Sequence, residues 1–162
     1  MGESIHIPSQ LTDKKERYES LLPQINSLVE GETDVIANLA NVMAALHHGM
    51  NFFWTGIYFV KGEELVLGPF QGPVACVRIK YGKGVCGTCW KNAETIVVPD
   101  VEQFPGHIAC NAESKSEIVV PIFRNGKVAA VLDVDSDQLS TFDETDAVFL
   151  EKISKLIERL LS

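Results

Sequence analysis

Apolar residues recur every three or four positions near both ends of the chain, which is the spacing of one helix face. The segment from Asp13 to Glu30 shows this pattern, and the segment from Thr33 to Gly49 repeats it with Thr33 as its predicted N-cap. A third stripe, capped by Thr141 or Asp143, runs to Leu160. The pattern therefore predicts two helices before a central region and one helix after it.

The central region changes to short runs of β-branched and aromatic residues, which favour strands. The predicted strands are Phe52–Val60, Glu64–Leu67, Cys76–Lys80, Thr95–Val98, Ile118–Phe123 and Val128–Val134. A short helix from about Val85 to Asn92 and a long loop, Pro99–Ser116, interrupt them. The order of elements predicts an α+β fold, a central antiparallel sheet with the N- and C-terminal helices packed on one face.

Composition narrows the class of protein. The 162 residues suit one domain, predicted at residues 12–162 behind a flexible arm at residues 1–11. No apolar run approaches the roughly 20 residues that span a bilayer, so no membrane association is expected. The first residues lack the pattern of a secretory signal, which favours the cytoplasm. The net charge of -8 argues against a nucleic-acid partner, since binding phosphates requires Lys and Arg.

One cysteine and three carboxylates form a candidate site. Cys110 lies in a polar loop of small residues, Glu117 begins one predicted strand, and Asp133 and Asp135 end the next. A thiolate is a nucleophile once its pKa is lowered, and His107 is a candidate cation for that. Repulsion between the two aspartates should raise an apparent pKa, so that a protonated carboxyl can donate a proton. The alternative is that these are strand-end carboxylates in solvent.

The other cysteines leave alternatives open. With no secretory signal, the four cysteines suit reduced thiols, redox-active thiols or metal ligands. Cys86 and Cys89 have C-x-x-C spacing, although the short strands around them do not suit a thioredoxin-like βαβ unit. Together with His107 and Cys110 they could also supply four zinc ligands.

The run from Asn51 to Leu150 resembles the GAF-domain free methionine-(R)-sulfoxide reductases. The matching motifs are W-T-G-x-Y at 54–58, G-P-x-A-C at 72–76, G-K-G-V-C-G at 82–87, G-H-I-A-C at 106–110, S-E-I-V-V-P at 116–121 and V-L-D-V-D at 131–135. A GAF fold alone implies only a ligand pocket, and a non-catalytic sensor module is the alternative. The presence of Cys76, Cys86 and Cys110 within three of these motifs is what indicates the reductase.

The resemblance implies a cysteine mechanism. Cys110 would attack the sulfoxide sulfur and be left as a sulfenic acid, which condenses with a second thiol. Cys76 is the first choice for that resolving thiol, and Cys86 is the second. Thioredoxin would then reduce the disulfide by thiol exchange, with no metal or organic cofactor required. A homodimer is left open.

The resemblance also assigns the substrate pocket. Glu117 and Asp135 would bind and protonate the sulfoxide oxygen, with Asp133 nearby in the polar wall. Trp54 would pack against the substrate's methyl group and Tyr58 would help to line the pocket. The two aromatic residues lie four apart in a predicted strand, so they share a face. The implied substrate is free methionine-R-sulfoxide.

Two residues depart from the family pattern. Cys89 stands where the family has a small residue without a thiol, which keeps an extra redox partner or the zinc set open. Asn111 follows Cys110 where an aspartate is usual, and the loss of that negative charge should favour the thiolate slightly.

Overall fold

The computed structural model describes residues 4–162, which form four α-helices, six strands and one short 3-10 helix. The helices are α1 (Lys14–Val29), α2 (Val35–Met50), α3 (Gly84–Asn92), α4 (Glu144–Leu161) and the 3-10 helix η1 (Val101–Gln103). The strands are β1 (Trp54–Lys61), β2 (Glu64–Gln71), β3 (Arg78–Lys80), β4 (Ile96–Val98), β5 (Ser116–Arg124) and β6 (Lys127–Ser136). None of the helices in this range has the length and apolar character needed to cross a membrane.

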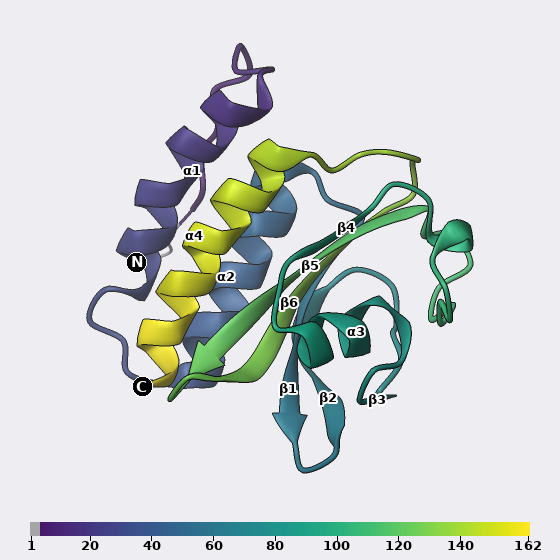
Figure 1. The fold of residues 1–162 in the computed structure, drawn as a ribbon. Coiled ribbons are helices and arrows are strands. Elements are labelled where there is room, and N and C mark those ends of the chain that lie inside the picture. The colour runs from purple at the N-terminus through teal and green to yellow at the C-terminus, as the bar shows by residue number, and fades with distance from the viewer. Residues whose placement is uncertain (1–3) are drawn as a thin grey trace.

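The six strands form one antiparallel sheet in the order β3-β2-β1-β6-β5-β4. Helices α1, α2 and α4 lie on one face, which we call the helix face (Figure 1). There α2 and α4 contact the strands, and α1 contacts α2 and α4. The short helix α3 covers the opposite face, which we call the pocket face. The predicted α+β arrangement, with the terminal helices on one face, is confirmed.

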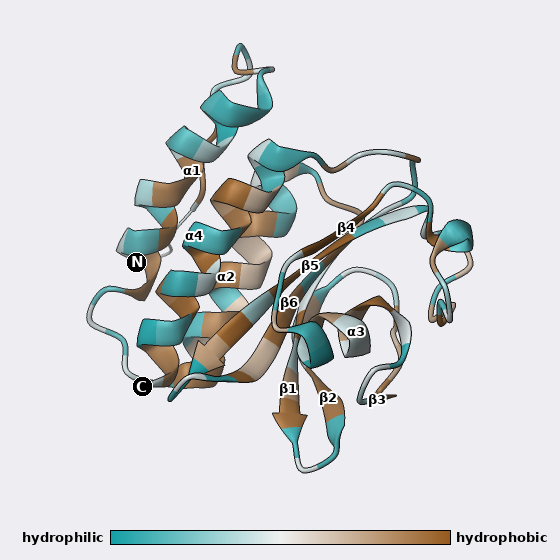
Figure 2. Ribbon diagram, in the orientation of Figure 1, coloured by the Kyte–Doolittle hydropathy of each residue, from teal (hydrophilic) through white to brown (hydrophobic). Residues whose placement is uncertain are grey.

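The helix face contains the main hydrophobic core. Apolar stripes of the three helices meet inward-facing residues of β1, β5 and β6, among them Ile57, Ile118 and Leu132. The outer sides of the helices are largely hydrophilic (Figure 2). The apolar spacing of the sequence also places Ile36 and Val148 on the buried faces of their helices, and this is wrong, because both side chains are exposed. They lie one residue away from the inward-facing positions of their helices.

The N-cap of α2 also differs from the prediction. Asp34, not Thr33, occupies the cap, and its side chain accepts a hydrogen bond from the backbone amide of Ala37. An aspartate one residue further along satisfies the same free amide of the first turn, so the helix starts one residue later than predicted.

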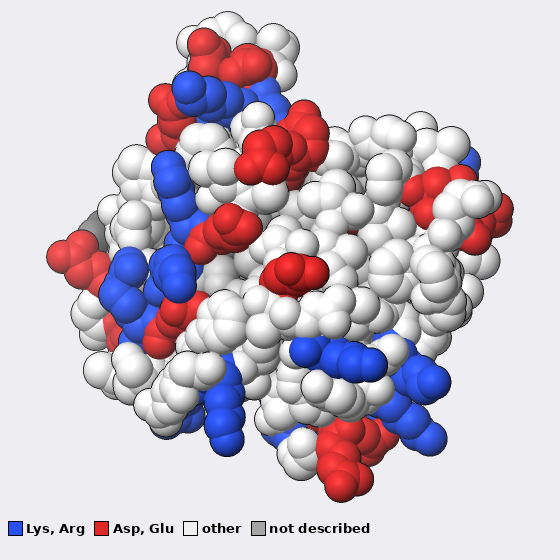
Figure 3. Space-filling view, in the orientation of Figure 1, with Lys and Arg blue, Asp and Glu red and all other residues white. Residues whose placement is uncertain are grey.

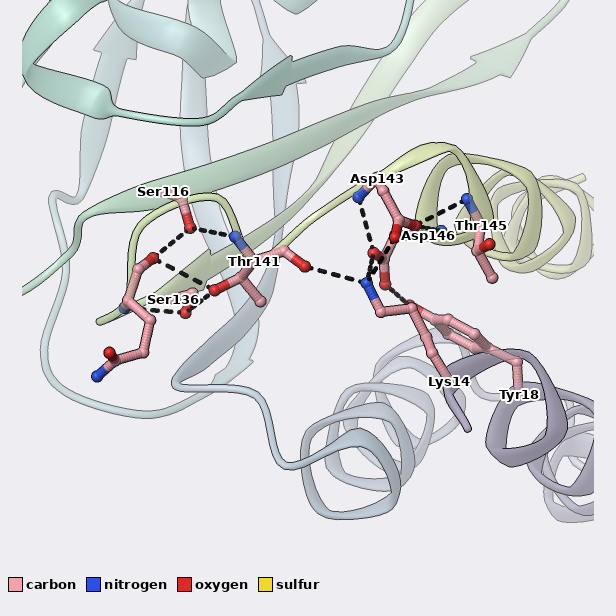
Figure 4. A network of polar contacts seen from close by, with 9 residues as sticks. Lys14, Tyr18, Ser116, Ser136, Thr141, Asp143, Thr145 and Asp146 are labelled. Atoms are coloured by element: carbon pink, nitrogen blue, oxygen red, sulfur yellow. Dashed lines mark hydrogen bonds and ion pairs between the residues drawn. The ribbon is translucent and has the colours of Figure 1, made fainter. Parts of the chain in front are cut away.

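A polar network ties α1 to the start of α4 (Figure 4). Asp146 is buried and accepts hydrogen bonds from Lys14 Nζ and from the Tyr18 hydroxyl, both at 2.5 Å. Lys14 Nζ also donates to the Thr141 carbonyl at 3.0 Å. Burial and the nearby Asp146 carboxylate raise the pKa of Tyr18 well above its usual value, so its hydroxyl stays a donor.

The N-terminal segment has no helix or strand between residues 4 and 13. Ile5 and Ile7 nevertheless pack against the core, and the backbone of His6 exchanges two hydrogen bonds with the Gln24 side chain. This part of the predicted arm is held along α1, and its flexibility stays a prediction. Residues 1–3 of that arm lie outside the described residues.

Candidate active site

The candidate carboxylates and one aromatic residue form a row across three neighbouring strands. Trp54 on β1 pairs with Asp135 on β6, and Asp135 pairs with Glu117 on β5. Asp133 lies two residues before Asp135, so its side chain points to the same face. Sequence distance is irrelevant here, because the antiparallel order β1-β6-β5 brings these strand ends together on the pocket face.

A small cavity of about 50 Å³ lies above this row, beneath α3 and the loop between β4 and β5. The cavity is lined by Trp54, Tyr58, Cys86, His107, Cys110, Glu117, Asp133 and Asp135, so it contains every candidate residue except Cys76 and Cys89. The convergence of thiol and carboxylates expected from the sequence is therefore present. The lining also includes residues that sequence reasoning did not select, such as Ile79, Lys83 and Ser114, because nothing in their local pattern distinguishes them.

Cys76 lies beside the cavity because it forms a disulfide with Cys110, with a Cα–Cα distance of 5.3 Å. Both residues are partly exposed. Cys76 was predicted to lie in a strand, but β3 starts only at Arg78 and leaves it in an irregular segment. The Tyr58 hydroxyl holds this segment by donating a hydrogen bond to the Cys76 carbonyl at 2.8 Å.

The aromatic wall consists of three stacked rings. Trp54 stacks on Tyr58 at 6.1 Å and on Phe70 at 5.4 Å between ring centroids. Gly56 makes this possible, because a Cβ atom there would lie 2.4 Å from the Trp54 ring and 2.7 Å from Phe70. Sequence reasoning missed Phe70, although the pairing of β2 with β1 in a hairpin is a signal that would have placed it near Trp54.

The carboxylates are not in solvent, so that alternative is wrong. Glu117 is 7% exposed and Asp133 is 5% exposed. Burial, followed by the negative charge of Asp133, raises the pKa of Glu117 well above its ordinary value. Burial and Asp135 raise the pKa of Asp133, and burial and Glu117 raise the pKa of Asp135. The cluster therefore holds protons at a pH at which exposed carboxylates have lost theirs.

The predicted zinc set of Cys86, Cys89, His107 and Cys110 is not assembled. Cys110 is bonded to Cys76, and the Cys89 thiol donates to the Val119 carbonyl at 3.7 Å. Cys86 points into the cavity, with Sγ 4.0 Å from Glu117 Oε2.

The charge states of these groups follow from their burial. Burial and the neighbouring Asp133 carboxylate raise the pKa of both the Cys86 and the Cys89 thiol, which favours their neutral forms. Burial lowers the pKa of His107, although Glu102 opposes this shift. His107 is therefore poorly suited to the role of a cation that activates Cys110.

The chain matches known proteins over most of its length. The GAF domain family model matches residues 34–161. "GAF domain-containing protein A" of Dictyostelium discoideum is 60% identical over 98% of this chain and 99% of its own. "Free methionine-R-sulfoxide reductase" of Saccharomyces cerevisiae is 45% identical over 91% of this chain and 87% of its own. The crystal structure of the free methionine-R-sulfoxide reductase of Neisseria meningitidis with its substrate superposes with a TM-score of 0.94, at 48% identity over 98% of this chain and 95% of that chain.

Proposed function

The chain belongs to the GAF-domain family of free methionine-R-sulfoxide reductases, and we propose that it reduces free L-methionine-(R)-S-oxide to L-methionine. The predicted GAF fold is confirmed by the same matches. One observation supports this reaction above the others. The Cys76–Cys110 disulfide borders a cavity whose floor carries three clustered carboxyls, of which Glu117 and Asp133 are buried, so a thiol pair and an acid face one small space.

The reaction starts from the dithiol form. The Cys110 thiolate attacks the sulfoxide sulfur while the oxygen takes up one proton. The oxygen passes as a hydroxyl group to the Cys110 sulfur, the sulfur–oxygen bond of the substrate breaks, and methionine leaves as Cys110 becomes a sulfenic acid. The Cys76 thiol then attacks the sulfenic sulfur, forming the disulfide and releasing water. One sulfoxide and two thiols thus yield one methionine, one disulfide and one water.

Glu117 and Asp135 are the proposed proton donors to the sulfoxide oxygen. They are paired across β5 and β6 and both line the cavity. Because burial raises the pKa of each, a proton remains on the pair near neutral pH. Asp133 contributes by raising the pKa of Glu117. One well-placed acid contributes about 10²–10⁴-fold to such a step.

The aromatic wall supports binding of the substrate's methyl and methylene groups. Trp54 is held in place by its Nε1–H, which donates to the Pro73 carbonyl at 2.9 Å, and by its stacking on Phe70. Tyr58 lies beside it. In the disulfide form the cavity has room for only a few water molecules, which is far less than an amino acid needs. Reduction of the disulfide is therefore expected to precede substrate binding.

Thioredoxin is the proposed reductant of the disulfide. Attack by an external thiolate requires access to a sulfur atom, and both Cys76 and Cys110 are partly exposed. Val74 and Val77 beside Cys76 are 86% and 61% exposed, and Ile108 lies exposed near Cys110. An apolar rim around an accessible disulfide suits a protein reductant better than a small hydrophilic thiol.

A reducing compartment follows from this cycle. Each turnover leaves a disulfide that must be reduced again, so we propose the cytoplasm as the location. Homodimer formation stays a prediction, and the mass in solution measured by light scattering would decide it.

The test is thioredoxin-coupled NADPH consumption with the free R epimer, the free S epimer and a peptide-bound sulfoxide. Turnover is expected for the free R epimer alone, and Cys110→Ser should abolish it. Cys89→Ser is the matched control, because the Cys89 thiol donates a hydrogen bond to the Val119 carbonyl and does not line the cavity. This variant should leave turnover unchanged. Saturable binding of the sulfoxide without turnover, in protein with verified thiols, would instead establish a non-catalytic GAF module.

A further inference from the structure

Three potential metal ligands from three different elements meet at the floor of the cavity. Within residues 4–162, Cys86 of α3, Glu117 of β5 and Asp133 of β6 form a group of ligand atoms that all lie within 4.8 Å of one another. All three residues are buried. Their positions are fixed by a helix and two paired strands, so the group is a property of the folded sheet and not of a surface loop.

A second observation indicates that this group is arranged to hold a ligand. Asp133 lines the cavity, and its Oδ1 atom is buried without a hydrogen-bond partner among the described residues. A buried polar atom without a partner costs on the order of 1–3 kcal/mol, so folded proteins rarely retain one without a reason. A cation bound between Asp133 and its neighbours would satisfy this oxygen.

The donor set selects the kind of ion. One thiolate combined with two carboxylates suits a borderline-soft cation such as Zn²⁺, whereas Mg²⁺ and Ca²⁺ prefer oxygen ligands alone. Zinc bonds of about 2.3 Å to sulfur and about 2.1 Å to oxygen hold neighbouring ligand atoms about 3.5 Å apart. Cys86 Sγ and Glu117 Oε2, at 4.0 Å, are already near that separation.

The charge of the surroundings favours a cation. The chain carries a net charge of -8. Acidic side chains gather on the loop that carries η1, at the right of the molecule in Figure 3, and Asp100, Glu102 and Glu113 belong to this loop. The same loop supplies Cys110 and Ser114 to the cavity lining. Lys83 also lines the cavity, but it stands against three carboxyls there, so the acidic groups of the lining and of this loop outnumber the positive charge and favour a divalent cation.

We propose that Cys86, Glu117 and Asp133 form an inhibitory zinc site at the floor of the cavity. The ion binds Cys86 as a thiolate and the two carboxylates, and its fourth position faces the cavity. Zinc binding itself is independent of the reductase activity. Inhibition rests on the proposed function, because the bound ion occupies Glu117, the proposed proton donor, and so competes with the sulfoxide oxygen.

This site differs from the zinc set suggested by sequence spacing. It keeps Cys86 but replaces Cys89, His107 and Cys110 with two carboxylates from the sheet. Cys89 therefore provides a matched control, since it is a buried cysteine of the same helix whose thiol points at Val119 instead.

The binding test uses the disulfide form of the full chain and zinc chloride, in competition with a chromophoric zinc indicator. One Zn²⁺ per chain is expected, with no competition from Mg²⁺. Substitution of a residue that only hydrogen-bonds to a metal ligand weakens metal affinity by about 10–100-fold. Loss of a direct ligand in Cys86→Ser should therefore weaken zinc binding by about 100-fold or more. Cys89→Ser should bind as the wild type does. No binding by the wild type, or equal losses in the two variants, would overturn the site.

Two further measurements do not depend on how well a variant folds. Co²⁺ bound to the wild-type chain should show the near-ultraviolet charge-transfer band of a thiolate ligand, and its absence would contradict ligation by Cys86. In single-turnover methionine release by the reduced chain, zinc should raise the sulfoxide concentration needed for half-maximal rate. Zinc that binds without changing this concentration would overturn the inhibitory role while leaving the site itself in place.

Discussion

The two faces of the sheet bury different kinds of side chain. The helix face buries aliphatic and aromatic residues from three long helices, and its buried Asp146 is paired with Lys14 and Tyr18. The pocket face is covered only by α3 and by loops, and it buries two free thiols and a carboxylate cluster that includes Glu117 and Asp133.

This difference between the two faces means that one contributes mainly to stability and the other mainly to the chemistry of the site. Polar groups on the helix face have partners, so they add little strain to the folded state. The pocket face keeps carboxylates together at raised pKa and leaves the buried Asp133 Oδ1 without a hydrogen-bond partner within residues 4–162, which lowers stability. We infer that the helix face stabilises a sheet whose other face is arranged for proton donation and thiol chemistry.

The largest effect is expected for Glu117→Gln on the pocket face. The variant loses the proposed proton donor, so kcat should fall by about 10²–10⁴-fold while KM changes much less. The melting temperature should stay equal or rise, because a repelling carboxyl is removed from the cluster. Steady-state kinetics and thermal melts measure both, with Glu63→Gln in the exposed β1–β2 turn as the control. An unchanged kcat would remove Glu117 from the mechanism.

The reverse pattern is expected for Leu132→Ala on the helix face. Leu132 lies on β6 next to Asp133, but its side chain is fully buried among the helices. Its truncation should cost about 2–5 kcal/mol of unfolding free energy and leave kcat of the folded protein nearly unchanged. Urea denaturation and kinetics at low temperature distinguish the two effects. A loss of kcat as large as that of Glu117→Gln would show that the two faces do not act separately.

The pH dependence of stability should come from the pocket face. In the unfolded chain carboxyls lose their protons above about pH 4, whereas the raised pKa of Glu117, Asp133 and Asp135 keeps protons in the folded chain. The stability from these groups is full below that pH and is lost as pH rises through the folded pKa. Each contributes a slope of at most about 1.4 kcal/mol per pH unit.

Urea denaturation at pH 5 and pH 8 measures this slope. The wild type should be less stable at pH 8 than at pH 5, and the difference should be smaller in Glu117→Gln. The same difference in both proteins would show that the pH dependence arises elsewhere.

The smallest effect is expected at the Asp146 network. Asp146→Ala leaves the buried Tyr18 hydroxyl without its acceptor and should cost about 1–3 kcal/mol. Asp146→Asn keeps an acceptor oxygen for Tyr18 and loses the contacts of Oδ2 with the partly exposed Lys14 and with the backbone amide of Asp143, so it should cost less. Chemical denaturation of the two variants compares them. Equal losses would mean that the contacts of Oδ2, and not the hydrogen bond from Tyr18, stabilise the network.

Much of this organisation follows from the sequence. The helical stripes and the strand runs predict the α+β sheet, because both faces of the sheet must be covered. The convergence of Glu117, Asp133 and Asp135 follows from a hairpin across Asn125-Gly126, in which strand ends meet.

Other features depend on long-range packing. The sequence does not show that the carboxylates are buried, because α3 and the β4–β5 loop cover them only in the folded chain. It also does not show that Cys89 faces Val119 while Cys86 faces the cavity. Residues three positions apart lie on the same side of a helix, but their side chains do not point in the same direction. The contribution of Phe70 depends on how far β2 continues beside β1, because the sequence pattern ends this strand at Leu67 and the folded strand extends to Gln71.

The most direct test of the account is peptide mapping by mass spectrometry after one turnover. Fully reduced protein is mixed with free methionine-R-sulfoxide in the absence of reductant, alkylated and digested. The account predicts one methionine released per chain and a disulfide joining Cys76 to Cys110, with Cys86 and Cys89 alkylated. A Cys86–Cys110 disulfide would transfer the resolving role to the buried thiol, and methionine release without any disulfide at Cys110 would contradict the cysteine mechanism.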